Sequence, residues 1–126
     1  MRLPLHARYT DYDTKGHVNN AVYLTYFEIA RGHAWREHLG LPDDPEFVVA
    51  EARVRYLSPA MVGESLEIEI RTTEIRTKAW VWTYAVRCAD DGRAIAEGTT
   101  VQVWYDYARR TSAPIPDHVR ERLPTV

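Results

Sequence analysis

Asp11-Tyr-Asp13-Thr-Lys-Gly16-His17-Val18-Asn19-Asn20 is a polar stretch that runs directly into an apolar segment extending from Ala21 to about Leu39. Gly16 supplies the backbone freedom that a sharp turn requires. Asp13, Asn19 and Asn20 are residue types that accept hydrogen bonds from the free amides of a helix's first turn. We therefore predict a tight polar loop at the start of a helix, with the rest of the chain folded around that helix.

The predicted helix from Ala21 to about Leu39 is apolar around most of its circumference. One face carries Tyr23, Phe27, Ala30 and Ala34, and a neighbouring face carries Val22, Tyr26 and Ile29. Such a helix should be covered on most sides. Gly32 in its middle predicts a close backbone approach. Gly40 and Pro42 predict the end of the helix.

The remaining chain shows the alternation of apolar and polar residues that is typical of strands. A short strand is predicted over Leu3–Tyr9. Longer strands are predicted from Phe47 to Tyr56, across Leu66–Arg71, over Ala79–Cys88 and over Arg93–Asp106. Asp90-Asp91-Gly92 is a strong hairpin signal, and Gly98 predicts a bulge or bend. The segment from Pro116 to Leu123 should form a short helical turn.

The order is therefore one strand, one long helix and four strands joined by short turns. Three of these joints are short enough for antiparallel neighbours. This order predicts an α+β protein in which an antiparallel sheet curls around a central helix. The apolar edge of that sheet should favour a partner chain.

Composition limits the classes of function. The 126 residues are 45% hydrophobic and 27% charged, which predicts one soluble domain with a substantial core. The net charge of −2 argues against a nucleic-acid surface. The single Cys88 excludes an internal disulfide and is expected to be a buried structural thiol. No apolar run reaches the ~20 residues of a membrane span, and no signal-peptide core is present, so we predict a cytoplasmic protein without a membrane partner.

The polar loop leaves its own role open at this point. Asp13 is either a turn-forming aspartate or a carboxylate that acts as general base or nucleophile beside a helix end that stabilises an oxyanion. His17 is either a structural hydrogen-bonding residue or part of the same site. No second His or Cys stands at the spacing of a zinc site, and we expect no metal.

A longer segment carries a family resemblance. Tyr9-Thr-Asp11-Tyr-Asp13-Thr-Lys-Gly16-His17-Val18-Asn19-Asn20-Ala-Val-Tyr23-Leu-Thr-Tyr26-Phe27-Glu28 resembles the signature of the 4-hydroxybenzoyl-CoA thioesterase family of hot-dog proteins. The motif Tyr56-x-x-Pro59-x-x-x-Gly63 and the strand order extend the likeness over nearly the whole chain. The resemblance implies a single hot-dog thioesterase domain over residues 1–126.

The resemblance also implies an activity and an assembly. The family hydrolyses acyl-CoA thioesters to free acid and CoA without a metal or redox cofactor. Its catalytic carboxylate corresponds to Asp13, and the backbone amide that polarises the carbonyl corresponds to Asn20. Subunits join edge to edge as homodimers, dimers commonly pair into tetramers, and the active sites lie at the dimer interface.

Further roles follow from the same resemblance. The carboxylate would attack the thioester directly or deprotonate water, and His17 would orient water or substrate. Gly16, Val18, Asn19 and Tyr23 are the expected substrate-binding residues, although Asn19 could equally support the loop. The form Gly16-His17-Val18-Asn19-Asn20 suggests a broader or aliphatic substrate preference rather than hydroxybenzoyl specificity. Two alternatives remain: a non-hydrolytic acyl-CoA or acyl-carrier binding module, and an enoyl-thioester hydratase.

The phosphates of CoA need cationic partners, ideally arginine. The predicted strand ends and turns offer four candidates, namely Arg76, Lys78, Arg109 and Arg110.

Overall fold

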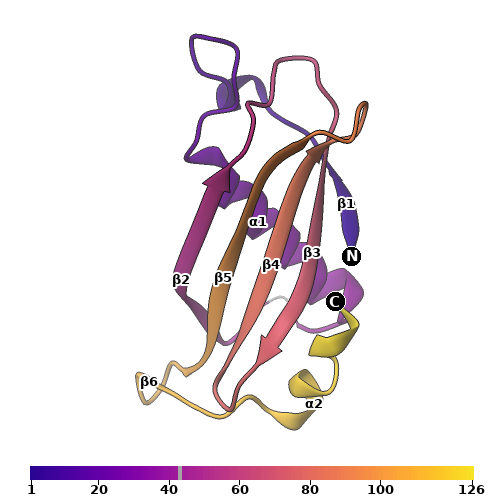
Figure 1. The fold of residues 1–126 in the computed structure, drawn as a ribbon. Coiled ribbons are helices and arrows are strands. Elements are labelled where there is room, and N and C mark those ends of the chain that lie inside the picture. The colour runs from indigo at the N-terminus through magenta and orange to yellow at the C-terminus, as the bar shows by residue number, and fades with distance from the viewer. Residues whose placement is uncertain (43) are drawn as a thin grey trace.

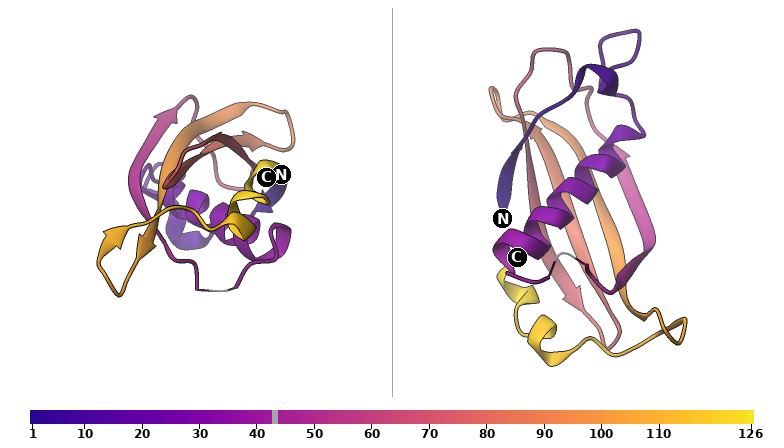
Figure 2. Two further views of the ribbon diagram at one scale, coloured as in Figure 1. Left: turned by 90° about the horizontal axis from the view of Figure 1, so that it is seen from below. Right: turned by 180° about the vertical axis from the view of Figure 1, so that it is seen from behind.

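The structure, a computed structural model, describes residues 1–42 and 44–126 and shows a curled sheet with a long helix across its concave face (Figures 1 and 2). The helix α1 (Val22–His33) continues directly into a π-helical turn, Ala34–His38. Gly40 follows with a φ of 62°, the left-handed conformation that ends many helices. The predicted helix is confirmed.

The helix α1 is buried on one side only. The buried residues of α1 and its π-helical turn are mainly aromatic or small: Tyr23, Tyr26, Phe27, Ala30, Ala34 and Trp35. Leu24 and Ile29 lie outside this face and are 45% and 44% exposed. The expectation that most sides of the helix are covered is therefore wrong for the single protomer, because the sheet covers one side and leaves the other open.

In the described residues six strands form the sheet, and every neighbouring pair is antiparallel. The strands are β1 (Arg2–Leu5), β2 (Phe47–Tyr56), β3 (Leu66–Ile75), β4 (Ala79–Cys88), β5 (Ala94–Asp106) and β6 (Thr111–Ser112). Their spatial order is β1-β3-β4-β5-β2, and the short β6 pairs with β5. A short helix α2 (Asp117–Arg120) lies in the segment where a helical turn was predicted, and a 3₁₀ turn, Leu123–Thr125, follows it.

Two local predictions were wrong. The first strand ends at Leu5 rather than Tyr9, and Tyr9–Asp11 forms a 3₁₀ turn instead. The strands β2 and β3 are not neighbours, because residues 57–65 cross from the edge strand β2, past β5 and β4, to β3. The turns from β3 to β4, from β4 to β5 and from β5 to β6 do join adjacent strands. The crossing segment passes over the end of the sheet that holds the polar loop (Figure 1).

The strand β2 is an edge strand. Its register shifts between Val49 and Glu51, which leaves Ala50 in a bulge. Glu51, Arg53 and Arg55 are exposed, as predicted for the solvent face, but Ala52 and Tyr56 are exposed as well. The row that should face the core is thus only partly covered, because no strand of the described chain lies beyond β2.

The centre of the core lies between β4 and α1. Trp80, Trp82, Tyr84 and Val86 alternate along β4 and are all buried, as the sequence predicted. The ring of Phe27 stacks on Tyr84 with a centroid distance of 4.2 Å. Cys88 at the end of β4 is a buried free thiol, which confirms its structural character. In the described part of the chain, no helix is long and apolar enough to cross a bilayer.

Two of the glycines singled out in the sequence, Gly98 and Gly32, differ from expectation. Gly98 keeps a regular ladder with Val54 on one side and Tyr84 on the other, so it forms no bulge. It instead admits the ring of Phe27, whose Cε2 would lie 2.6 Å from a Cβ at this position. The close neighbour of Gly32 is not a backbone but the guanidinium group of Arg36.

Candidate active site

The polar loop is a tight turn built around Asp13. The Oδ1 atom of Asp13 accepts hydrogen bonds from the amides of Lys15 (2.9 Å) and His17 (3.1 Å). The Asp13 amide donates to the carbonyl of His17 at 2.8 Å, and the Gly16 amide donates to the carbonyl of Asp13 at 3.1 Å. Gly16 has a φ of 73°, which explains the glycine at this point. Asp13 therefore forms the turn, and the same contacts hold its carboxylate in a fixed place, which leaves a catalytic role open.

The same contacts keep Asp13 ionised. The backbone amides of His17 and Lys15 lower the pKa of Asp13 below its ordinary value. The side chain is exposed, and among the described residues no donor reaches its second oxygen, Oδ2. One carboxylate oxygen thus fixes the loop while the other remains available to water or a ligand.

The amide of Asn20, just before the start of α1, is free. The N–H groups around it are all engaged: Val18 donates to Ala60 O (2.9 Å), Asn19 to Asp11 O (2.8 Å), Ala21 to Asn19 Oδ1 (3.0 Å) and Val22 to Asn19 O (3.0 Å). Within residues 1–42 and 44–126, the N–H of Asn20 donates to no protein acceptor. A free N–H at a helix start is suited to bind an oxygen that carries negative charge.

A hollow of about 410 Å³ brings most of the predicted site residues together. One wall contains Asp13, His17, Val18, Asn20 and Tyr23, and the other contains residues 56–59 from the end of β2 and the crossing segment. Gly16 and Asn19 do not line it. Gly16 makes the turn, and the Asn19 side chain binds the Ala21 amide, so the structure places both in supporting positions.

Tyr23 forms the inner part of this hollow. Its side chain is 3% exposed, and its ring meets the rings of Tyr26 and Tyr56 edge-on at 5.8 and 5.5 Å. Burial raises the pKa of Tyr23, so the phenol is neutral at physiological pH. Tyr23 therefore combines core packing with a surface that faces the hollow.

Asp11 stabilises the loop from its buried side, a role that was not predicted from the sequence. The carboxylate is buried and accepts hydrogen bonds from the Arg8 amide (2.8 Å), the Arg8 guanidinium (2.9 and 3.1 Å) and the Tyr26 hydroxyl (3.1 Å). Burial alone would raise the pKa of Asp11, but the hydrogen bonds from Arg8 and Tyr26 outweigh it and lower the pKa. The spacing Arg8-x-x-Asp11, which suits a single helical turn, was the available signal.

Replacing Asp11 with asparagine should lower the free energy of unfolding by about 1–3 kcal/mol, because a buried acceptor becomes a donor facing other donors. We assign the effect mainly to the buried contacts, since Arg8 is largely exposed and its ion pair is screened. Urea unfolding at pH 7 measures the loss. Because the folded-state pKa of Asp11 is lowered, its contribution exists above about pH 4 and disappears as pH falls through that pKa.

The milder variant Tyr26→Phe, which removes one donor only, should cost less than Asp11→Asn. Equal stability of wild type and Asp11→Asn at pH 7 would contradict this account of the loop.

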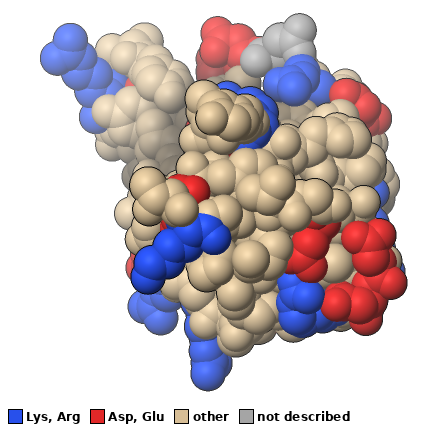
Figure 3. Space-filling model, turned by 90° about the horizontal axis from the view of Figure 1, so that it is seen from above, with Lys and Arg blue, Asp and Glu red and all other residues tan. Residues whose placement is uncertain are grey.

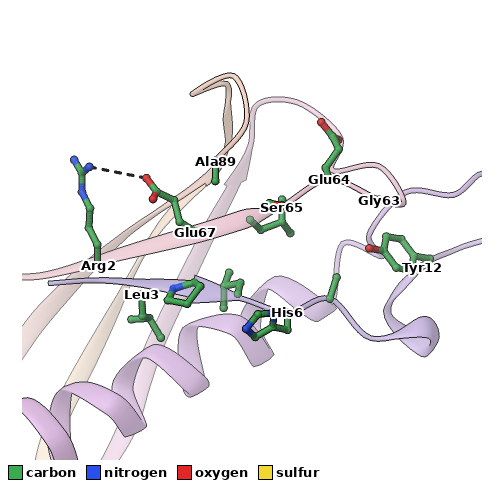
Figure 4. Close-up of a pocket in the computed structure, with 13 residues that line it drawn as sticks. Arg2, Leu3, His6, Tyr12, Gly63, Glu64, Ser65, Glu67 and Ala89 are labelled. Atoms are coloured by element: carbon green, nitrogen blue, oxygen red, sulfur yellow. Dashed lines mark ion pairs between the residues drawn. The ribbon is translucent and has the colours of Figure 1, made fainter.

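A larger hollow lies elsewhere, at the end of β1. It has a volume of about 570 Å³ and lies between β1 and the start of β3 (Figure 4). Arg2 and Glu67 form an ion pair on its wall at 3.9 Å. Asp13, His17 and Asn20 are not among its lining residues. We therefore place the candidate chemistry in the smaller hollow, which is lined both by Asp13 with its charged carboxylate and by Asn20 with its free amide.

One cluster in the described chain has the composition of a metal site. Donor atoms of Glu64, Cys88 and Asp91 lie within 4.8 Å of one another. The guanidinium of Arg93 already binds both Glu64 oxygens (2.6 and 2.8 Å) and Asp91 (3.0 Å), and it lowers the pKa of Glu64. Burial raises the pKa of the Cys88 thiol. These side chains are therefore suited to an arginine rather than to a metal ion, and they connect the crossing segment to the turn between β4 and β5.

The four candidate cations for CoA phosphates lie far from the loop. Arg76 and Lys78 lie in the turn between β3 and β4, and Arg109 and Arg110 follow β5, all at the opposite end of the sheet from Asp13 (Figure 1). Arg76 is also paired with Glu74 at 2.7 Å. Figure 3 shows the loop end of the molecule, where a largely uncharged surface is surrounded by separate basic and acidic side chains.

Comparison with known proteins identifies the class. The pattern of the thioesterase-like superfamily matches residues 7–123. The chain belongs to this superfamily, and the expectation of a hot-dog thioesterase, both as a fold and as an enzyme class, is confirmed.

Individual relatives agree with this class. The chain is 30% identical over 96 residues to the acyl-CoA thioester hydrolase YbgC of Escherichia coli O6:H1, with 72% of each chain covered. It is 23% identical over 127 residues to the long-chain acyl-CoA thioesterase FadM of E. coli K12, with 98% and 96% covered. A thioesterase of Thermus thermophilus, solved with coenzyme A and zinc, is 34% identical with a TM-score of 0.86, and the match covers 97% of this chain and 95% of that one.

Proposed function

We propose that the protein is an acyl-CoA thioesterase in which Asp13 acts on the thioester and the amide of Asn20 polarises its carbonyl. The single observation that carries this proposal is the convergence of two groups in one hollow. Asp13, whose Oδ2 has no partner among the described residues, and Asn20, whose amide is free at the helix start, both line this hollow. The relationship to acyl-CoA thioesterases supports the choice of substrate.

The chemistry requires few groups because a thioester carbonyl is already electrophilic. Asp13 either takes a proton from water that attacks the carbonyl carbon or attacks that carbon itself to give a mixed anhydride, which water then opens. In both routes the C–S bond breaks, CoA leaves as a thiol after protonation, and the acid is released. The Asn20 N–H stabilises the charge that develops on the carbonyl oxygen.

The neighbouring residues have distinct proposed roles. His17 lines the hollow beside Asp13 and orients water or substrate. Val18 and Tyr23 bind the acyl group. Gly16 and Asn19 contribute to substrate binding indirectly. They fix the shape of the loop that carries the residues lining the hollow.

We further propose an aliphatic acyl group, and the loop form Gly16-His17-Val18-Asn19-Asn20 together with the relationship to FadM supports this preference. The open edge of β2 and the exposed side of α1 support a homodimer joined edge to edge and a dimer of dimers. In this proposal residues 1–126 form one domain that acts in the cytoplasm, without a nucleic-acid or membrane partner.

Product analysis tests the proposal directly. The protein is incubated with a saturated straight-chain acyl-CoA and with a 2-enoyl-CoA, and free thiol, free acid and enoyl absorbance are followed. Thiol release with an equal amount of acid is the expected result. Loss of enoyl absorbance without thiol would indicate a hydratase, and saturable binding without either change would indicate a binding module.

The pH profile tests the state of Asp13. Because the active form is the carboxylate and its pKa is lowered, kcat/KM should remain constant from neutral pH down to about pH 4 and fall only below it. Samples returned to pH 7 after each measurement show whether any loss is reversible, since Asp11 also titrates in the acid range. If kcat/KM instead began to fall at about pH 6.5, the usual range of an imidazole, the claim that the Asp13 carboxylate sets the pH dependence would be contradicted.

A further inference from the structure

Tyr56 connects the edge strand β2 to the start of α1. It is the last residue of β2, and its hydroxyl donates a 2.8 Å hydrogen bond to the carbonyl oxygen of Asn20. The side chain is 50% exposed, so water could have satisfied this hydroxyl. Its ring is held edge-on against the buried ring of Tyr23 at 5.5 Å, which aims the hydroxyl at the helix start.

The contact fixes the peptide between Asn20 and Ala21 at both ends. Its carbonyl accepts from Tyr56, and its N–H donates to Asn19 Oδ1 at 3.0 Å. Because a peptide is planar, two hydrogen bonds on opposite edges fix the orientation of its plane. The preceding peptide, between Asn19 and Asn20, is held only through its carbonyl, which accepts from Val22 at 3.0 Å. Its N–H is the free Asn20 amide.

We propose that Tyr56 is a positioning residue for the thioesterase reaction, because its hydroxyl holds the Asn20 backbone so that the free Asn20 N–H points at the thioester oxygen. This inference rests on the proposed role of the Asn20 amide. The dihedral angles of Asn20 determine how its free N–H is directed relative to the peptide that Tyr56 holds. Loss of the hydroxyl leaves one edge of that peptide unrestrained and lets the donor turn away from the hollow, and misalignment of this kind lowers the rate more than it weakens substrate binding.

The test uses Tyr56→Phe, which removes the hydroxyl and leaves the ring contact with Tyr23 in place. We expect kcat for acyl-CoA hydrolysis to fall by about 10-fold or more, with KM changed by less than about 2-fold. Tyr107→Phe is the matched control. The Tyr107 hydroxyl is also exposed and also donates to a backbone carbonyl of β2, that of Phe47 at 3.3 Å, but at the opposite end of the strand. It should leave kcat unchanged.

The amide resonances of Asn20 and Ala21 in a ¹H–¹⁵N spectrum provide a second readout, independent of catalysis. In Tyr56→Phe these two resonances should shift while those of the β4 core stay in place. Unshifted resonances would overturn the positioning role itself. Shifted resonances with an unchanged kcat would overturn the link to the reaction and would count against the Asn20 amide as the carbonyl donor. A wild type without hydrolysis would refute the proposed function, and the resonances would still report whether Tyr56 orients Asn20.

Discussion

Replacing Asp13 with asparagine should lower kcat for thioester hydrolysis by about 100-fold or more, the usual effect of losing a catalytic base. Asparagine is nearly isosteric and keeps an oxygen that accepts from the Lys15 and His17 amides, as Asp13 Oδ1 does. The turn should therefore survive while the charge and the basic Oδ2 are lost. Steady-state thiol release measures the effect, and circular dichroism with thermal unfolding shows that the fold is kept.

Asp106→Asn provides a matched control for Asp13→Asn. Asp106 Oδ1 also accepts two backbone amides, those of Ala108 and Arg109, both at 3.0 Å. Asp106 lies at the end of β5, at the opposite end of the sheet from the hollow (Figure 1). Its substitution should leave kcat unchanged. If both variants kept the wild-type rate, Asp13 would be a turn residue only.

The largest expected effect on stability comes from Gly98→Ala. A methyl group at this position would overlap the carbonyl oxygen of Arg53 and approach Phe27 Cε2 to 2.6 Å. The strand β5 is hydrogen-bonded on both sides at this point, so its backbone cannot move without breaking a ladder. Phe27 is fully buried and stacked on Tyr84, which leaves its ring little freedom. We expect a loss of about 3 kcal/mol in the free energy of unfolding, measured by urea denaturation.

Gly32→Ala is the control for this prediction. A methyl group there would meet only the Arg36 guanidinium, at 3.0 Å, and the end of a long side chain can shift. Alanine also favours the helix by up to about 1 kcal/mol relative to glycine. The variant should therefore be as stable as wild type or slightly more stable. A Gly98→Ala protein as stable as Gly32→Ala would show that β5 and α1 are not as closely packed as described.

Much of the fold could be predicted because each long element has a clear periodicity. The apolar run after Asn20 predicted α1, and the alternation of Trp80, Trp82 and Tyr84 predicted β4 with its buried face. The order of the strands within the sheet was harder to predict from the sequence. Residues 57–65 look like a short connection, and only the pairing of β2 with β5 shows that they cross the end of the sheet. Pairing between distant strands depends on tertiary packing, which local patterns do not contain.

The sequence predicted only those parts of the candidate site that are formed by side chains. The motif around Asp13 drew attention to the loop, and the structure brings Asp13, His17, Val18, Asn20 and Tyr23 to one hollow. The free amide of Asn20 is a backbone group, and its availability depends on which neighbouring amides are bonded. The buried contacts of Asp11 and the reach of Tyr56 to Asn20 depend in the same way on three-dimensional placement. A sequence specifies residue types but not their hydrogen-bond partners.

The most direct test of the central claim is thiol release from a series of acyl-CoAs, short to long and aromatic, by wild type and Asp13→Asn side by side. The account predicts that wild type hydrolyses aliphatic acyl-CoAs fastest and that the variant is slower by about 100-fold or more on every substrate that wild type accepts. A folded wild type that binds acyl-CoA yet releases no thiol from any member of the series would contradict the account.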